Sequence, residues 1–404
     1  MQIEYPRLIS SVYGEITAIL LVYPGLLSAQ GNDEYADIVK VFERKGVVYR
    51  FRKEVHQFKL AIGNFRDRDP DDSKNDRFRS QYNLEPGVDI LSLLNSWSAE
   101  LDNVRKRGTM TFQRWVQDPF LTLELGTITV LLNSLHNQRL CDFFLPLEVA
   151  QQVGPQFLVS PTRLYLEGGN LLRGIRTVFV GKDLIRRNRN ELGLSRKEVM
   201  QQLRQDLGVD SILELGNKDL VGGLGLDTGQ PEDSFQPIFH LDMFLNFAGL
   251  DESGKEIVLF GDPAMCIELG GLPSHPGVNP TEQVKKAIPI FKEVREQIER
   301  EGFRVIRLPL VFFNGIVFSW NNCLVEVGMN GKFVYLPSYQ TSADHEQLNP
   351  TFRGLELYIE NLYQHLGFEV IWFRHGRFFR TIAEHGGSLH CIVKVMRRKS
   401  AEPG

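Results

Sequence analysis

The chain has 404 residues, of which 42% are hydrophobic and 24% charged, and its formal net charge at pH 7 is -4. This composition is typical of a folded globular protein and excludes a disordered one. Basic runs such as Arg397-Arg398-Lys399 are too short to indicate a nucleic-acid-binding surface. The apolar run 16–27 contains Pro24 and is too short to span a bilayer. We therefore expect no nucleic-acid partner and no membrane partner.

The cysteines and the first residues of the sequence bear on the compartment. Cys141, Cys266, Cys323 and Cys391 are far apart in sequence and form no CxxC pair, which argues against a zinc knuckle and favours reduced thiols. Residues 1–6 lack the charged-then-apolar pattern of a secretion signal. We expect a cytoplasmic protein, and leave self-association into a homo-oligomer open.

The first part of the chain begins with a β-α-β pattern. A strand is predicted at 16–23, a helix from 32 to 42 and a second strand at 47–51. The charged, turn-rich stretch 67–76 and a predicted helix at 89–107 indicate an insertion around 54–107. We interpret residues 1–404 as one catalytic domain that carries this insertion. The alternating residues 121–125 predict the next strand.

Strands and helices alternate through the remainder of the chain. Ser195 and Glu198 have the spacing of a capping box and predict a helix to about residue 207. Further helices are predicted at 281–301 and 355–366, a glycine-rich loop at 220–230, and strands at 164–166, 177–180, 237–244, 303–308, 334–337 and 368–373. Hairpin-like strand pairs recur between helices, which favours an α/β fold of repeated ββαβ units over a doubly wound sheet.

Polar residues stand at the ends of several predicted strands. Asp118 and Glu167 are two of them. His240 and Asp242 share one face of a predicted strand, because side chains alternate with a period of two. Buried carboxylates without partners are costly, so several at one site imply a bound cation or a metal. A His-x-Asp pair with distant carboxylates is also a ligand set for non-haem iron or manganese.

Cys391 follows the glycine pair Gly386-Gly387 and precedes the β-branched run Ile392-Val393. This pattern predicts a thiol at the mouth of a strand, where reactive groups are often held. A lone cysteine beside a strand is more often a small buried apolar residue. Together with a histidine, however, a thiol also suits the roles of nucleophile and general acid or base.

Four motifs, taken together, resemble those of the guanidino-group-modifying enzyme superfamily. They are Gln-Asp-Pro-Phe at 117–120, Leu-Glu-Gly-Gly-Asn at 166–170, Phe-His-Leu-Asp-Met-Phe at 239–244 and Gly-Gly-Ser-Leu-His-Cys at 386–391. The superfamily contains arginine, agmatine and peptidylarginine deiminases, dimethylarginine hydrolases and amidinotransferases. All four occur in the expected order, and the resemblance spans residues 115–398. It implies a five-bladed α/β propeller of ββαβ modules, the pentein fold.

The resemblance also implies a role for each motif residue. Cys391 is the expected nucleophile and His240 the proton shuttle, oriented by Glu167. Asp118 and Asp242 are expected to clamp the guanidinium of a small arginine-like substrate, since paired carboxylates satisfy its fork of donors. No metal and no cofactor is expected.

The substrate is less well defined by the sequence. Gln117 stands where many relatives have Arg, which leaves the subfamily open. Arg187, among other arginines of its loop, and Asn322 are candidates for binding the amino-acid part of a substrate, with a solvated loop or a turn as the alternative. We expect a deiminase that releases ammonia and a ureido product through a covalent amidino-thioether. An amidinotransferase, which passes the amidino group to an amine, is the alternative, and a non-catalytic guanidino binder is a third reading.

Overall fold

The computed structural model describes residues 5–23, 29–52, 54–55, 110–111, 114–135, 140–219, 221, 234–270, 280–341 and 349–399. The predicted insertion at 54–107 and the glycine-rich loop at 220–230 therefore lie almost entirely outside the described residues.

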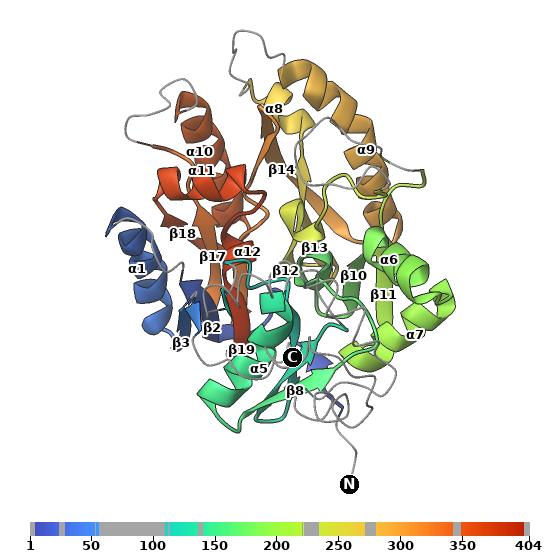
Figure 1. Cartoon of the computed structure of the whole chain (residues 1–404). Helices are drawn as coiled ribbons and strands as arrows, with labels where there is room; N and C mark the ends of the chain where they lie inside the picture. The colour runs from blue at the N-terminus through green and yellow to red at the C-terminus, as the bar shows by residue number, and fades with distance from the viewer. Residues whose placement is uncertain are drawn as a thin grey trace.

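Five small sheets share one construction: two antiparallel strands, then one or two helices, then a third strand parallel to the second. The order is the ββαβ unit expected from the sequence. The helices lie toward the outside of the molecule and the strands toward its middle (Figure 1). The first sheet is β6 (Phe120–Leu125), β7 (Ile128–Asn133), α5 (Leu140–Val153) and β8 (Phe157–Pro161), with β1 (Arg7–Leu8) on the edge of β6.

The next three sheets follow along the chain. The second is β9 (Leu171–Arg173), β10 (Thr177–Gly181), α6 (Lys182–Leu192), α7 (Arg196–Leu207) and β11 (Ser211–Leu215). The third is β12 (Leu245–Leu250), β13 (Glu256–Asp262), α8 (Ala264–Glu268), α9 (Pro280–Arg300), β14 (Arg304–Phe313) and β15 (Ile316–Ser319). The fourth is β16 (Leu324–Gly328), β17 (Gly331–Pro337), α10 (Asn349–His365) and β18 (Phe368–Phe373).

The fifth sheet joins segments from opposite ends of the described chain. β19 (Lys394–Lys399) pairs antiparallel with β2 (Glu15–Tyr23), which leads through α1 (Ala29–Glu43) to the parallel strand β3 (Val47–Arg52). A two-stranded pair, β4 (Glu54–Val55) with β5 (Met110–Thr111), completes the strands described. None of the described helices is both long enough and apolar enough to cross a bilayer.

The sheets form from apolar runs that become buried. The middle strands β10 and β13 are buried along nearly their whole length, and a large apolar cluster joins β2 and α1 to the sheets of β12 to β18. The predicted capping box is confirmed: Ser195 Oγ accepts from the Glu198 backbone N–H at 3.3 Å, and Glu198 Oε2 accepts from the Ser195 N–H at 2.7 Å.

Two predicted strands that carry site residues are wrong. Residues 164–166 form no strand, because their backbone groups bind side chains: Asn188 Oδ1 accepts from the Tyr165 N–H and Ser134 Oγ accepts from the Leu166 N–H. Residues 237–244 form bends and the 3₁₀ turn η3 (Leu241–Met243) before β12 begins. In this segment the side chain of Gln236 donates to the carbonyls of Ile238 and Phe239, which a ladder would otherwise use.

Two differences concern the segment before Cys391. The predicted loop after β18 contains α11 (Gly376–Glu384). Cys391 lies in the short helix α12 (Leu389–Ile392), and β19 begins only at Lys394, so the thiol is on a helical turn and not at the first residue of a strand. The helix expected to begin near residue 32 begins at Ala29, and that expected at 355 begins at Asn349.

Candidate active site

Glu167 and His240 each precede a short 3₁₀ turn, η2 (Gly168–Asn170) and η3. His240 Nε2 is 3.4 Å from Glu167 Oε2, and His240 Nδ1 is 3.6 Å from Asp118 Oδ1. A Cβ on Gly169 would be 2.5 Å from His240 Nδ1, closer than real contacts allow. The close approach of the turn to the imidazole therefore requires glycine at this position.

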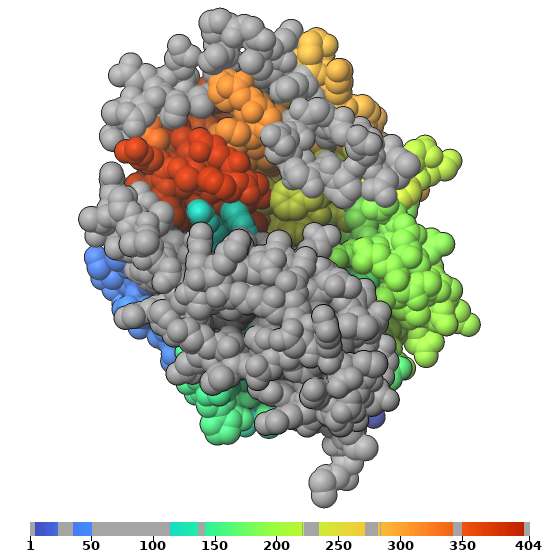
Figure 2. All heavy atoms as spheres, in the orientation of Figure 1, coloured from blue at the N-terminus to red at the C-terminus, as the bar shows by residue number. Residues whose placement is uncertain are grey.

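Cys391 is buried, with 4% of its surface exposed, and it is held by Asn322. The Asn322 amide donates to Cys391 Sγ at 3.2 Å, and its oxygen accepts from the Cys391 backbone N–H at 3.2 Å. The Cys391 carbonyl in turn accepts from the Gln117 N–H at 3.3 Å, which joins the thiol segment to the turn that carries Asp118. In the space-filling view three parts of the chain meet near the centre of the face: the teal part after residue 110, the olive part near residue 240 and the red C-terminal part (Figure 2).

Asp242 is almost fully buried, and its two oxygens differ. Its Oδ2 accepts a hydrogen bond from Nδ1 of the buried His390 imidazole at 2.8 Å. Oδ1 is buried and makes no hydrogen bond with any of the described residues. The Asp242 carbonyl accepts from the Asn322 amide at 3.3 Å, which places this carboxylate beside the residue that holds Cys391.

The electrostatics of the site oppose a thiolate in the absence of a ligand. Burial raises the pKa of Cys391 well above its ordinary value, and the negative charges of Asp242 and Asp118 raise it further. The hydrogen bonds from Ser388 and Asn322 act in the opposite direction but are weaker. Both carboxylates therefore lie close enough to Cys391 to act on its charge.

His240 has the opposite balance. Burial alone lowers its pKa, but Asp118, Glu167 and Asp242 outweigh burial and raise the pKa to about 9. The imidazole is accordingly protonated at neutral pH, which is the state needed in a general acid.

Arg187, predicted to bind substrate, forms ion pairs inside the protein. Its Nη1 is 2.8 Å from Glu167 Oε1, and its Nε is 3.0 Å from Glu191 Oε1. Its guanidinium also lies 4.7 Å from the ring centroid of Tyr165. Arg187 therefore contacts the residue that partners His240, and no contact connects it with Cys391.

Six of the seven predicted site residues are linked through direct contacts or charge effects at Cys391 and His240: Asp118, Glu167, His240, Asp242, Asn322 and Cys391. Two further residues, His390 and Lys394, are buried at this site and were not predicted from the sequence. His390 stands inside the Cys391 motif, but nothing in the motif indicates its pairing with Asp242. A lysine in a strand is usually exposed, so Lys394 gave no signal.

Lys394 is 3% exposed and supports the turn that carries Asp118. Its ammonium donates to the Gln117 carbonyl at 3.0 Å and also to the Phe120 carbonyl. Burial lowers the pKa of Lys394 to about 7, although Asp118 and Asp242 favour the charged form. The part of the chain that the structure describes contains no group of three or more His, Cys, Asp or Glu side chains arranged to hold a metal ion. The iron or manganese reading thus has no ligand set among them.

Comparison with protein-family profiles and with curated protein sequences found no match. Solved structures share the fold. One, from Porphyromonas gingivalis and provisionally described as an arginine deiminase, has a TM-score of 0.58 and 15% identity, over 98% of each chain. A substrate-bound Cys-to-Ser variant of agmatine deiminase from C. jejuni has a TM-score of 0.57 and 15% identity, over 100% of this chain and 99% of that one.

A third structure, agmatine deiminase of Enterococcus faecalis, has a TM-score of 0.55 and 13% identity, over 97% of this chain and 96% of that one. At these identities the likeness is one of fold. The resemblance inferred from the four motifs is confirmed at that level: the chain has the α/β fold of guanidino-modifying deiminase structures.

Proposed function

We propose that the protein is a cysteine-dependent hydrolase that converts the guanidinium of an arginine-like small molecule to a ureido group and releases ammonia. The observation that carries the proposal is the grouping of a buried thiol with two carboxylates: Asn322 donates both to Cys391 Sγ and to the Asp242 carbonyl, and the N–H next to Asp118 in the chain donates to the Cys391 carbonyl. Asp242 Oδ1 has no hydrogen-bond partner among the described residues. A planar cation with several N–H donors is the ligand that such carboxylates would satisfy.

Substrate binding would also prepare the nucleophile. Asp118 and Asp242 raise the pKa of Cys391 in the unliganded protein. A guanidinium bound between them places positive charge beside the thiol and offsets their effect, so the pKa of Cys391 falls when the substrate is present. In this proposal the thiolate forms mainly in the complex, where it is needed.

The reaction then takes two steps. The Cys391 thiolate attacks the central guanidinium carbon, and the protonated His240 donates a proton to the departing nitrogen, which leaves as ammonia. The carbon remains bound to sulfur as an amidino-thioether. His240, now neutral, accepts a proton from water, whose oxygen attacks the same carbon; the carbon–sulfur bond breaks and the thiolate is restored, while the hydroxyl left on the carbon gives its proton to solvent as the ureido product leaves.

The remaining residues hold these groups in place. Glu167 orients His240, and Arg187 orients Glu167 through their 2.8 Å ion pair. Asn322 positions the sulfur of Cys391 by donating to it at 3.2 Å. We also propose that the five sheets are the blades of one closed propeller.

We further propose a cytoplasmic location. Its support is that Cys266, Cys323 and Cys391 are free thiols.

The structural neighbours support the same class of chemistry. Two of the three described above are agmatine deiminases, and one of these carries serine in place of cysteine with substrate bound. Agmatine is therefore the first substrate to test, followed by arginine. Arg187 would have to leave two ion pairs to bind the α-carboxylate of arginine.

The deciding experiment incubates the full chain with agmatine, arginine or a peptidyl arginine and measures ureido product and ammonia separately. We expect both products in equal amounts from one of the three substrates. An amidinotransferase would turn over only with an added amine such as glycine, and it would then form a new guanidino compound and release the donor's amine, with neither ureido product nor ammonia. Loss of activity with EDTA, restored by a divalent ion, would instead favour metal chemistry.

Cys391→Ser should abolish turnover without loss of fold, since a hydroxyl is a far weaker nucleophile near neutral pH. Cys266→Ser is the matched control, because Cys266 is also buried and donates to the Leu310 carbonyl, a bond that serine keeps. Equal activity in the two variants would remove Cys391 from the mechanism. Binding of guanidino compounds without any turnover in the native protein would support the non-catalytic binder.

A further inference from the structure

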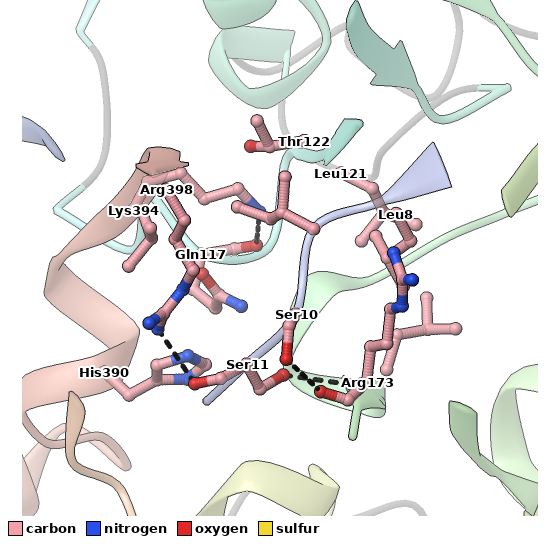
Figure 3. Close-up of a pocket in the computed structure, with 13 residues that line it drawn as sticks. Leu8, Ser10, Ser11, Gln117, Leu121, Thr122, Arg173, His390, Lys394 and Arg398 are labelled. Atoms are coloured by element: carbon pink, nitrogen blue, oxygen red, sulfur yellow. Dashed lines mark hydrogen bonds between the residues drawn. The ribbon is translucent and has the colours of Figure 1, made fainter. Parts of the chain in front are cut away.

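A second site adjoins the candidate active site. A cavity of about 40 Å³ lies between β1, β6, β9 and β19, and Gln117, His390 and Lys394 lie in its wall (Figure 3). His390 connects the two sites, since it lines this cavity and also donates to Asp242. The other lining residues are Leu8, Ile9, Ser10, Ser11, Leu121, Thr122, Leu171, Arg173, Val395 and Arg398.

The charged residues of the wall are all basic. Arg173, Lys394 and Arg398 line the cavity, and none of the described residues that line it is an aspartate or a glutamate. Carboxylates outside the wall act on these side chains: Glu124 and Glu256 on Arg173, Glu326 on Arg398, and Asp118 and Asp242 on Lys394. Burial lowers the pKa of Arg398 to about 10, and the charge of Glu326 acts in the opposite direction.

Three buried polar atoms of the wall have no hydrogen-bond partner among the described residues. They are Thr122 Oγ1, Arg173 Nη1 and Arg398 Nε. Thr122 is only 2% exposed. All three atoms can donate, and buried donors are rarely left without an acceptor. An acceptor that also carries negative charge would satisfy them and offset the basic side chains.

The cavity has room for such a group. Its volume of about 40 Å³ corresponds to about three water molecules, and an oxyanion with one central atom has a comparable size. Water would satisfy the donors but not the charge of the side chains. We propose that this cavity binds a small inorganic oxyanion, phosphate or sulfate, with Arg173, Arg398 and Thr122 as its donors. Its charge would then lie beside His390, on the side of the ring away from Asp242.

Isothermal titration calorimetry of the full chain with inorganic phosphate tests this site. The reference titration uses sodium chloride at the same ionic strength, because salt screens exposed charges and would by itself change the measured heat. We expect saturable binding of one phosphate per chain. Arg173→Met removes a donor and a charge, and it should raise the phosphate Kd by about tenfold or more. Thr122→Val keeps the shape and removes one hydroxyl, with an expected rise of about threefold to tenfold.

Arg176→Met is the matched control. Arg176 lies three residues from Arg173, is exposed and does not line the cavity, yet its replacement changes the net charge equally. The phosphate Kd of the Arg176→Met variant should stay within about twofold of the native value. Absence of saturable phosphate or sulfate binding in the native chain overturns the proposal. An equal loss of phosphate affinity in the Arg173 and Arg176 variants also overturns it, because it would show that phosphate responds only to the net charge of the chain. Circular dichroism confirms that each variant is folded.

Discussion

Asp118 and Asp242 act on the same thiol from differently supported positions. One oxygen of Asp242 is held by His390, and the other has no partner among the described residues. Asp118 lies 3.6 Å from the ring of His240, on a turn that Lys394 supports. At the scale of single residues, the site therefore contains two carboxylates near the thiol, each held by a different neighbour.

Asp118→Asn and Asp242→Asn should each lower kcat/KM for the best guanidino substrate by about a hundredfold or more, because removing one member of a buried charge pair costs about 3–5 kcal/mol. Steady-state kinetics gives the ratio. Asp210→Asn, an exposed carboxylate, is the control and should change kcat/KM less than threefold. A change that small in either site variant would place that aspartate outside the site.

The pH dependence of activity should report His240. Its pKa is about 9, so its proton is present at neutral pH and is lost as the pH rises through about 9. We expect kcat, which reflects the enzyme–substrate complex in which the thiolate has formed, to fall on the alkaline side as His240 loses its proton. In Glu167→Gln the pKa of His240 should be lower, since one of the charges that raise it is gone, and the alkaline fall should move to lower pH. An unchanged profile in that variant would contradict the assignment.

At the scale of elements, the site is carried by short turns. Glu167 and His240 precede η2 and η3, and Cys391 lies in the four-residue α12. The sequence predicted the long, buried strands and the capped helix well, because periodic apolar runs and caps are local signals. It assigned strands at 164–166 and 237–244 wrongly, because the backbone there binds the side chains of Asn188, Ser134 and Gln236.

The resemblance of the four motifs was the only sequence signal for which residues come together at the site. Spacing along the chain does not place Asp118 near Cys391, which lies in α12, far away in sequence. The pairing of His390 with Asp242 and the burial of Lys394 depend on contacts between segments more than 100 residues apart, as the separations of 148 and 277 residues show. No local pattern in a single sequence contains that information.

The glycine beside His240 offers a test at this scale. Gly169→Ala places a Cβ 2.5 Å from His240 Nδ1, so the imidazole must move. A misplaced general acid should lower kcat by about tenfold to a hundredfold, while substrate binding changes less.

Gly354→Ala is the matched control for this substitution. Gly354 lies within α10 with nothing within 4 Å of the added Cβ, so alanine should stabilise the fold by about 0.5–1 kcal/mol and leave kcat unchanged. Chemical denaturation and kinetics on both variants separate the two effects. Full activity of Gly169→Ala would show that the turn does not fix the histidine.

At the scale of the whole molecule, Arg398 joins three parts of the chain. Its Nη1 donates to the carbonyls of Val12 and Gly14, and its Nη2 donates to those of Ser11 and Val325. The side chain thus fastens β19 to the segment before β2 and to β16. It is 7% exposed, so no solvent replaces these bonds.

Arg398→Met should lower the free energy of unfolding by about 3 kcal/mol or more, because it removes the buried hydrogen bonds that the guanidinium donates to four backbone carbonyls. Guanidinium chloride titration measures the change. Arg397→Met is the control: Arg397 is exposed, and its replacement should cost less than about 1 kcal/mol. Similar losses in the two variants would show that the carbonyl contacts of Arg398 contribute little to stability.

The pairing of β2 with β19 also sets the order of events during synthesis. Thr17 and Arg397, which meet across this pair, are 380 residues apart in the chain. At about 5–20 residues per second, a ribosome needs roughly 20–75 s between the two strands. Through that interval the edge of β2 has no partner from β19, and the thiol of Cys391 has not yet been made. A nascent chain would therefore acquire the thiol of Cys391 and its fifth sheet together.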